Sequence, residues 1–116
     1  MDSMSLPPAF KEISGAEVQA MLARGSSARL VDVRQPWEHA RSHISGILLM
    51  PMDEFAARYT EELDPADEIV CVCEHGIRST AAAHFLAAQG YQNVATMTGG
   101  MAEYHGPVKM GTEEDR

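Results

Sequence analysis

The sequence predicts an α/β domain that contains a mostly parallel sheet with helices on both faces. Candidate strands alternate with candidate helices, and the strands are apolar throughout instead of alternating apolar and polar residues. Such strands are typical of parallel sheets whose two faces are both covered. The residues best suited to chemistry follow the ends of these strands, where open α/β sheets place their sites.

The first part of the chain supplies two strands and one helix. Residues 10–13 form a short candidate strand, and residues 14–17 match a capping box that opens a helix ending at Gly25. Residues 28–33 form the next strand, and Pro36 stops its continuation. The order strand, helix, strand is typical of a parallel sheet.

The second part supplies three more strands. Residues 46–50 are predicted as a strand and residues 53–59 as a short helix. Residues 68–72 form a continuous apolar strand, residues 79–89 an alanine-rich helix, and residues 93–97 the last strand. We therefore expect a five-stranded sheet, and the ends of three strands are expected to line one pocket.

Length and charge limit the classes of function. The 116 residues predict one domain over residues 1–116, with flexible termini at 1–8 and 111–116. A hydrophobic content of 45% and a charged content of 22% are those of a globular protein. The formal net charge of −8 argues against nucleic acid or an anionic membrane as the main partner, because both require a basic surface.

The chain shows no apolar run of membrane-spanning length, and its first residues lack the basic and apolar pattern of a signal peptide. It contains only two cysteines, and the single residue between them would strain a direct disulfide. We therefore expect free thiols and a cytoplasmic protein.

The most informative segment runs from Cys73 to Ser79. Cys73 follows the strand at 68–72 and precedes the helix at 79–89, so unpaired N–H groups and the positive end of the helix dipole converge on its sulfur. A thiolate is stabilised in such a setting and becomes available as a nucleophile. Gly76 allows a tight turn and Arg78 adds positive charge. The segment is therefore predicted to be an anion cradle that contains a nucleophile.

Each of these residues also has a structural interpretation. Cys73 could be a buried structural thiol, but its position at a strand–helix junction makes this the weaker hypothesis. Cys71 lies inside the apolar strand and is interpreted as core packing, with a redox role as the minority alternative. The two cysteines lack the spacing of zinc ligands, so no metal is expected.

Arg78 has two possible roles, which are to bind a substrate anion or to anchor the loop by pairing with Asp32 or Glu38; anchoring is at least as well supported. Asp32, Arg34 and Glu38 are then interpreted as a scaffold around the loop. His75 could tune the sulfur or contact an acceptor, or could simply be solvated.

Methionines and the single tryptophan are interpreted mainly as core residues. Met97 and Met101 are the exception, because they flank the Thr98-Gly99-Gly100 turn and are predicted at the rim of the pocket.

The chain resembles the rhodanese-like single-domain sulfurtransferases. The resemblance covers nearly the whole chain, through Leu30-Val31-Asp32-Val33-Arg34 with Glu38, Ser42-His43-Ile44-Ser45-Gly46-Ile47, Cys73 to Ser79, Gly90-Tyr91-Gln92-Asn93-Val94 and Thr98-Gly99-Gly100-Met101. Ser42 stands where the family usually has glycine, and Tyr104 stands where a tryptophan is common. Neither departure touches the nucleophile.

The resemblance implies a three-layer rhodanese-like fold, a persulfide on Cys73 and no cofactor. The donor would be thiosulfate or another sulfane-sulfur compound, and the acceptor cyanide, a thiol or a thioredoxin-like protein. The persulfide cradle would be made by Glu74, His75, Gly76, Ile77, Arg78 and Ser79. His43 would be a hydrogen-bonded structural histidine.

Two other functions remain open. Cysteine phosphatases and arsenate reductases also have a cysteine loop closed by arginine, but the phosphatase loop is one residue longer than the four residues between Cys73 and Arg78. The shorter loop suits one added sulfur atom better than a tetrahedral oxyanion. The second alternative is a non-catalytic or sulfur-relay module of the same fold.

Overall fold

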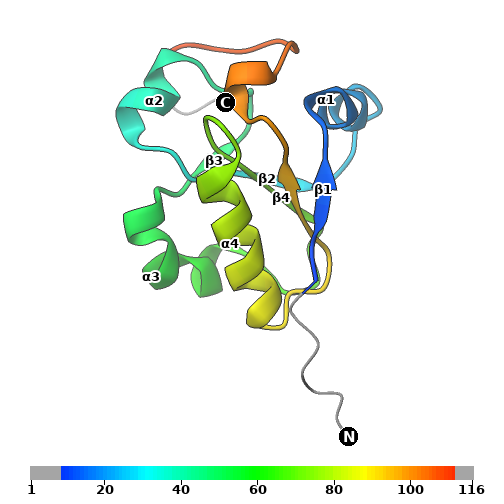
Figure 1. Cartoon of the computed structure of the whole chain (residues 1–116), viewed down its shortest axis with the longest axis vertical. Coiled ribbons are helices and arrows are strands. Elements are labelled where there is room, and N and C mark those ends of the chain that lie inside the picture. The colour runs from blue at the N-terminus through cyan, green and yellow to red at the C-terminus, as the bar shows by residue number, and fades with distance from the viewer. Residues whose placement is uncertain (1–8, 112–116) are drawn as a thin grey trace, which may run out of the picture.

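A computed structural model describes residues 9–111 of the chain (Figure 1). Its strands are β1 (Lys11–Ile13), β2 (Arg29–Asp32), β3 (Leu48–Leu49), β4 (Ile69–Val72) and β5 (Val94–Met97). Its α-helices are α1 (Gly15–Ala23), α2 (Pro36–Arg41), α3 (Met52–Glu62) and α4 (Ile77–Ala88), and a 3₁₀ helix, η2, spans Met101–Glu103.

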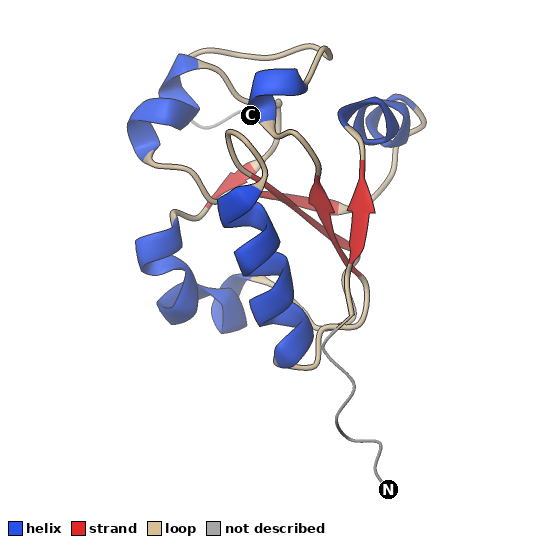
Figure 2. Ribbon diagram, in the orientation of Figure 1, coloured by secondary structure: helices blue, strands red, loops and turns tan. Residues whose placement is uncertain are grey.

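The five strands form one parallel sheet in the order β1-β5-β4-β2-β3 (Figure 2). This confirms the predicted α/β class and the five-stranded sheet. Strand β4 lies in the centre of the sheet, and all strands point the same way, so their carboxyl ends meet at one edge. The loop after β4 therefore lies in the middle of the edge where a site is expected.

Helices cover both faces of the sheet, which gives the three layers that the sequence predicts. Helices α3 and α4 lie on one side and α1 on the other (Figure 1). Alternate residues of β4 divide between two apolar cores: Ile69 and Cys71 face α3 and α4, whereas Val70 and Val72 face α1. Because both faces are buried, the strand is apolar at every position.

Helix α2 was not expected from the sequence. Pro36 was interpreted only as the end of a strand, but it lies in the first turn of α2, where its missing N–H costs no helical hydrogen bond. Glu38 accepts a 2.9 Å hydrogen bond from the Gln35 amide, which satisfies a free donor at the start of the helix.

Other boundaries differ by a few residues. The strand predicted at 46–50 is only Leu48–Leu49, the helix predicted at 53–59 spans Met52–Glu62, and the helix predicted from Ser79 begins at Ile77. The short 3₁₀ helix η2 was also not expected. The differences at the ends of α3 and α4 are ordinary, because hydrogen bonding fades gradually at helix ends.

The predicted flexible termini lie almost wholly outside the described residues. Gly111 is the one residue of these termini that the structure describes, and its amide donates a 2.7 Å hydrogen bond to the Ala40 carbonyl. Between residues 9 and 111, no helix has the length and hydropathy needed to cross a membrane.

Candidate active site

The site begins at Cys73, the first residue after β4. The chain turns at Gly76, which has a φ of 100° and directly precedes α4. Residues with a Cβ rarely adopt this left-handed conformation, so glycine suits the turn that brings the start of α4 back over the sulfur.

The sulfur of Cys73 receives two backbone hydrogen bonds. The amides of Gly76 and Ser79 donate to Sγ at 3.0 and 3.2 Å, and Ser79 Oγ lies 3.3 Å away. Cys73 is only 1% exposed, so these donors replace water around the sulfur. The amino end of α4 adds its partial positive charge, and the arrangement therefore favours negative charge on Sγ.

Arg78 binds Glu38 with both ends of its guanidinium group. Its Nη1 and Nη2 lie 2.7 and 2.8 Å from the two carboxylate oxygens of Glu38. The hydrogen bonds from Arg78 are the largest cause that lowers the pKa of Glu38 from 4.5 to about 2. Of the two interpretations of Arg78, this geometry supports anchoring, because the carboxylate occupies the groups that would bind a substrate anion.

Arg34 forms a second ion-pair group with Asp32 and Glu74. Its Nε and Nη2 bind the two oxygens of Asp32 at 2.9 Å, and its Nη1 binds Glu74 at 3.0 Å. Arg34 and Asp32 are 1% and 0% exposed, and Glu74 directly follows Cys73 in the chain. The three predicted scaffold residues thus belong to two ion-pair groups. Glu38 binds Arg78, whereas Asp32 and Arg34 form a group with Glu74.

A pair of histidines extends the second group. His39 Nδ1 lies 2.9 Å from Asp32, and the His39 ring stacks on His43 with ring centroids 3.8 Å apart. His43 is 1% exposed and its Nδ1 lies 2.9 Å from the His39 carbonyl, which confirms the prediction of a hydrogen-bonded structural histidine. His39 was missed because α2, which carries it, was missed.

The Gly99-Gly100 turn supports the loop from its other side. The amides of Met101 and Ala102 donate to the carbonyls of Cys73 and Glu74 at 2.8 and 2.9 Å. A Cβ at Gly100 would lie 2.4–2.5 Å from the backbone of Cys73 and Glu74, closer than atoms can approach. Glycine at position 100 therefore permits this contact, which joins the loop after β4 to the turn after β5.

The prediction that Met97 and Met101 lie at the rim is wrong. They are 0% and 9% exposed, and both pack in the core on the α1 side of the sheet. Met97 shares its strand face with Ala95, because side chains alternate along β5, and that face is covered. Trp37 also differs from expectation: it is 63% exposed, with the Arg41 guanidinium carbon 5.4 Å from its ring centroid.

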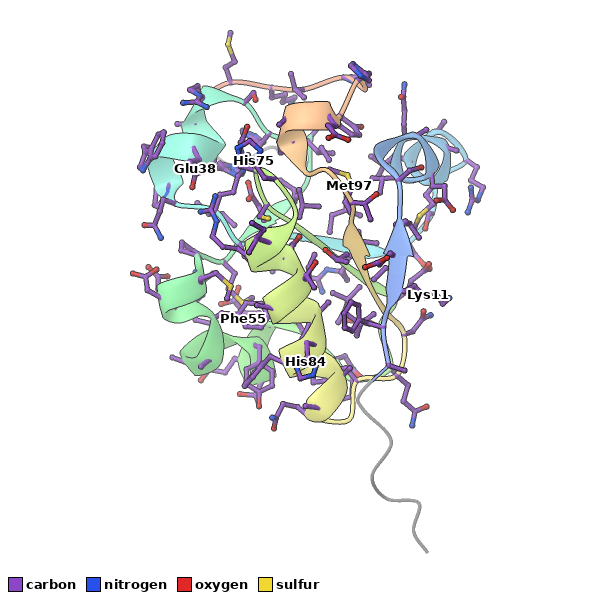
Figure 3. The ribbon with its side chains drawn as sticks, viewed as in Figure 1. Lys11, Glu38, Phe55, His75, His84 and Met97 are labelled. Carbon is purple, nitrogen blue, oxygen red and sulfur yellow. The ribbon has the colours of Figure 1, made fainter. Side chains whose placement is uncertain are left out.

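Two loop side chains point outward. Ile77 is 80% exposed, and His75 is exposed at the same end of the molecule as Glu38 (Figure 3). These residues are the most exposed part of the loop, whereas Cys73 and Ser79 are buried.

Cys71 differs sharply from Cys73. It is 0% exposed, and burial is the main cause that raises its pKa to about 12. Both cysteines are free thiols. These observations support the interpretation of Cys71 as core packing. Within residues 9–111, no three side chains of His, Cys, Asp or Glu are grouped as metal ligands.

Comparisons with known proteins agree with this geometry. The rhodanese-like domain family matches residues 14–106. The thiosulfate sulfurtransferase GlpE of Haemophilus influenzae (strain PittEE) is 37% identical over 91 residues, which cover 78% of this chain and 84% of GlpE. A crystal structure of a rhodanese-like domain protein from Staphylococcus aureus matches with a TM-score of 0.78 at 25% identity, over 87% of this chain and 98% of that one.

A further relative is the putative sulfur carrier protein YrkF of Bacillus subtilis, which is 33% identical over 98 residues. The match covers 84% of this chain and 52% of YrkF, so the chain spans about half the length of that relative. Since the family match covers most of the sequence, the chain belongs to the rhodanese-like family.

Proposed function

We propose that the chain is a rhodanese-type sulfurtransferase that forms a persulfide on Cys73. It would move sulfane sulfur from thiosulfate or a related donor to cyanide or a thiol. The observation that carries the proposal is the Cys73 sulfur held by two amides at the amino end of α4. The relative named thiosulfate sulfurtransferase GlpE supports the donor. The reaction needs no cofactor, because sulfur alone changes partner.

In the first step the Cys73 thiolate attacks the outer sulfur of thiosulfate. A bond forms between Sγ and that sulfur, the S–S bond of thiosulfate breaks, and its electron pair leaves with sulfite. The product is a persulfide anion on Cys73. The loop amides and the dipole of α4 stabilise negative charge throughout this step.

In the second step the acceptor attacks the outer sulfur of the persulfide. With cyanide, a carbon–sulfur bond forms, the persulfide S–S bond breaks, and its electron pair returns to Sγ. Thiocyanate leaves and the Cys73 thiolate is restored. The amides that donate to Sγ make this thiolate a better leaving group, because they stabilise the charge it regains.

The ion pairs position the loop in this proposal and do not contact the substrate. Arg78 holds the first turn of α4 against α2 through Glu38, and Arg34 holds Glu74 against β2. A loop held from both sides keeps its amides directed at Sγ before the substrate arrives. Such preorganisation avoids the cost of ordering the donors during the reaction.

A sulfur-relay module is the second candidate function, because one relative is a putative sulfur carrier. In that case a thioredoxin-like or other protein thiol would take the sulfur, and the exposed His75 and Ile77 would be its first contacts.

We also propose a single domain over residues 1–116 in a reducing cytoplasm, where free Cys71 and Cys73 are stable.

Steady-state kinetics on two substrates test the proposed reaction. We expect turnover of thiosulfate with cyanide and negligible hydrolysis of aryl phosphates, because the short loop suits one sulfur atom and crowds the three oxygens of a phosphoryl group. Efficient phosphate hydrolysis without persulfide formation would favour the cysteine phosphatase alternative, and arsenate reduction would favour that of an arsenate reductase. Persulfide formation with slow turnover on cyanide and rapid turnover on a protein thiol would favour the relay.

A further inference from the structure

We infer that Thr96, on strand β5, is a positioning residue that directs the Ser79 hydroxyl proton onto the sulfur of Cys73. Thr96 Oγ1 lies 2.7 Å from Ser79 Oγ, which lies 3.3 Å from Sγ. All three side chains are buried, with exposures of 1%, 0% and 1%. The inference deepens the proposed function, because it rests on Cys73 acting as a thiolate.

The sheet explains why a residue of β5 reaches this site. The parallel register of β4 and β5 pairs Thr96 with Cys71. Val94, two residues before Thr96 on β5, lies in the core that faces α3 and α4. Because side chains alternate along a strand, Thr96 points to the same side of the sheet. Ser79 lies in the first turn of α4 on that side, and Thr96 therefore lies beneath the helix turn that holds the sulfur.

The Gly76 carbonyl competes weakly for the Ser79 proton. It lies 3.2 Å from Ser79 Oγ, but it already accepts hydrogen bonds from the Thr80 amide at 3.2 Å and the Thr80 hydroxyl at 2.7 Å. A carbonyl oxygen has two lone pairs, and Thr80 uses both. As a thiol, Cys73 donates to Ser79 Oγ, and the Ser79 hydroxyl donates to this crowded carbonyl. Once Cys73 is a thiolate it can only accept, and the Ser79 proton can turn to Sγ.

The direction of the Thr96–Ser79 hydrogen bond follows from proton accounting. Within residues 9–111, Ser79 is the hydrogen-bond partner of the Thr96 hydroxyl. If Ser79 donated to Thr96, the Thr96 proton would be buried without an acceptor, which is destabilising. The favoured arrangement has Thr96 donating to Ser79 and Ser79 donating to Sγ. A thiolate then receives three hydrogen bonds, and every hydroxyl proton of the group is used.

The charged groups around Cys73 are separate from this hydroxyl pair. Arg78 of α4 interacts with Cys73 electrostatically and binds Glu38 of α2. Arg34, which follows β2, binds Glu74 of the loop. On β4, Cys71 is the titratable neighbour of Cys73. Replacing Thr96 by valine leaves all of these groups in place and keeps the size and branching of the side chain.

The test measures the alkylation rate of Cys73 by iodoacetamide as a function of pH, with the labelled peptide identified by mass. In Thr96→Val we expect the midpoint of the pH profile to rise by about 0.5–1 pH unit, because the thiolate loses an oriented donor. Thr96→Ser keeps the hydroxyl and should restore the wild-type profile. An unchanged midpoint in Thr96→Val, or an equal rise in Thr96→Ser, would overturn the inference. If Thr96→Val does not fold, Thr96→Ala supplies the same comparison.

A double-mutant cycle adds a readout that a purely structural role would not move. If Thr96 acts through Ser79, then Thr96→Val should cause no further rise of the midpoint once Ser79→Ala is present. Additive shifts would contradict this. Alkylation requires neither sulfur donor nor acceptor, so a chain that shows the predicted shifts but transfers no sulfur would refute the proposed function and leave the inference about Thr96 standing.

Discussion

Cys71 and Cys73 lie two residues apart, face the same side of the sheet and are both buried, but their surroundings differ. Cys71 lies within β4, where burial raises its pKa to about 12. Cys73 lies one residue beyond the strand, where the amides of Gly76 and Ser79 donate to its sulfur. Burial is common to both thiols, so the hydrogen-bond donors distinguish the proposed nucleophile from the packing residue.

The difference arises from where the strand ends. Cys71 lies within the ladders that pair β4 with β2 and β5, where backbone amides serve the sheet. Past the end of β4, the amides of the loop and of the first turn of α4 are no longer committed to a ladder or a helix. They can therefore turn toward a side chain. The same residue type thus takes a different role within a distance of two residues.

Removing each thiol in turn should give the largest contrast. Cys73→Ser should abolish sulfur transfer and leave the fold intact, because the hydroxyl is a much weaker nucleophile. Cys71→Ala should retain transfer and lose about 1–3 kcal/mol of unfolding free energy, because it leaves a small cavity between the sheet and α4. Thiocyanate formation and urea denaturation measure the two effects. Loss of transfer in Cys71→Ala with an unchanged fold would revive the redox alternative for that residue.

The second prediction concerns the turn that supports the Cys73 loop. Gly100→Ala should greatly reduce sulfur transfer and stability, because the new Cβ would meet the backbone of Cys73 and Glu74 at 2.4–2.5 Å. Gly25→Ala is the matched control: Gly25 has a φ of 76°, but nothing lies within 4 Å of the new Cβ. The control should cost about 1 kcal/mol from backbone strain alone and keep full activity. Equal effects of the two substitutions would show that the contact with the loop is unimportant.

The third prediction is the pH dependence of the Glu38–Arg78 ion pair. Pairing with Arg78 lowers the pKa of Glu38 from 4.5 to about 2, so the unfolded chain binds this proton more readily than the folded protein. The stability that the pair contributes is therefore present above pH 4.5 and is lost as the pH falls toward 2. In Glu38→Gln this part of the acid destabilisation should disappear, so its unfolding free energy should change less between these pH values. Parallel curves of unfolding free energy against pH for the wild-type protein and Glu38→Gln would contradict the proposal that this ion pair is lost at acid pH.

Arg78→Lys separates charge from geometry in the same pair. Lysine keeps the positive charge but cannot bind both oxygens of Glu38 at once. If Arg78 anchors the loop, this variant should lose stability and turnover together while its KM for thiosulfate changes little. A large increase in KM at unchanged stability would instead indicate that Arg78 binds the substrate.

The smallest effect is expected at Tyr104, whose side chain packs in the core on the α1 side of the sheet. Within residues 9–111, the Tyr104 Oη is the only buried side-chain oxygen or nitrogen atom that has no hydrogen-bond partner. Tyr104→Phe removes that unsatisfied group and should leave sulfur transfer unchanged while stability stays the same or rises by up to about 1–2 kcal/mol. Thermal unfolding measures this, and a clear loss of stability would show that the hydroxyl has a partner.

The sequence was sufficient to predict the sheet and the cysteine loop because both depend on local patterns. The buried strands are continuous apolar runs, and Cys73 stands between such a run and a helical pattern, beside Gly76 and Arg78. The three scaffold residues could be named, but not their pairing. Whether Arg78 meets Asp32 or Glu38 depends on the position of α2, which local patterns did not reveal.

The rest of the site could not be predicted because it depends on tertiary contacts. Thr96 is a single hydroxyl in an apolar strand, and only the register of β5 beside β4 brings it under Ser79. His39 joins Asp32 only once α2 is formed. Met97 and Met101 were misplaced because position beside a turn says little about which side of the sheet a side chain takes.

The most direct test of the difference between the two cysteines is to map the sulfur after thiosulfate treatment. The protein is incubated with thiosulfate, digested without reductant, and the peptides that contain Cys71 and Cys73 are resolved by tandem mass spectrometry. We predict an increase of about 32 Da, one sulfur atom, on Cys73 and none on Cys71. Added sulfur on Cys71 with Cys73 unmodified would contradict the proposal that the strand end and its free amides determine which thiol carries the sulfur.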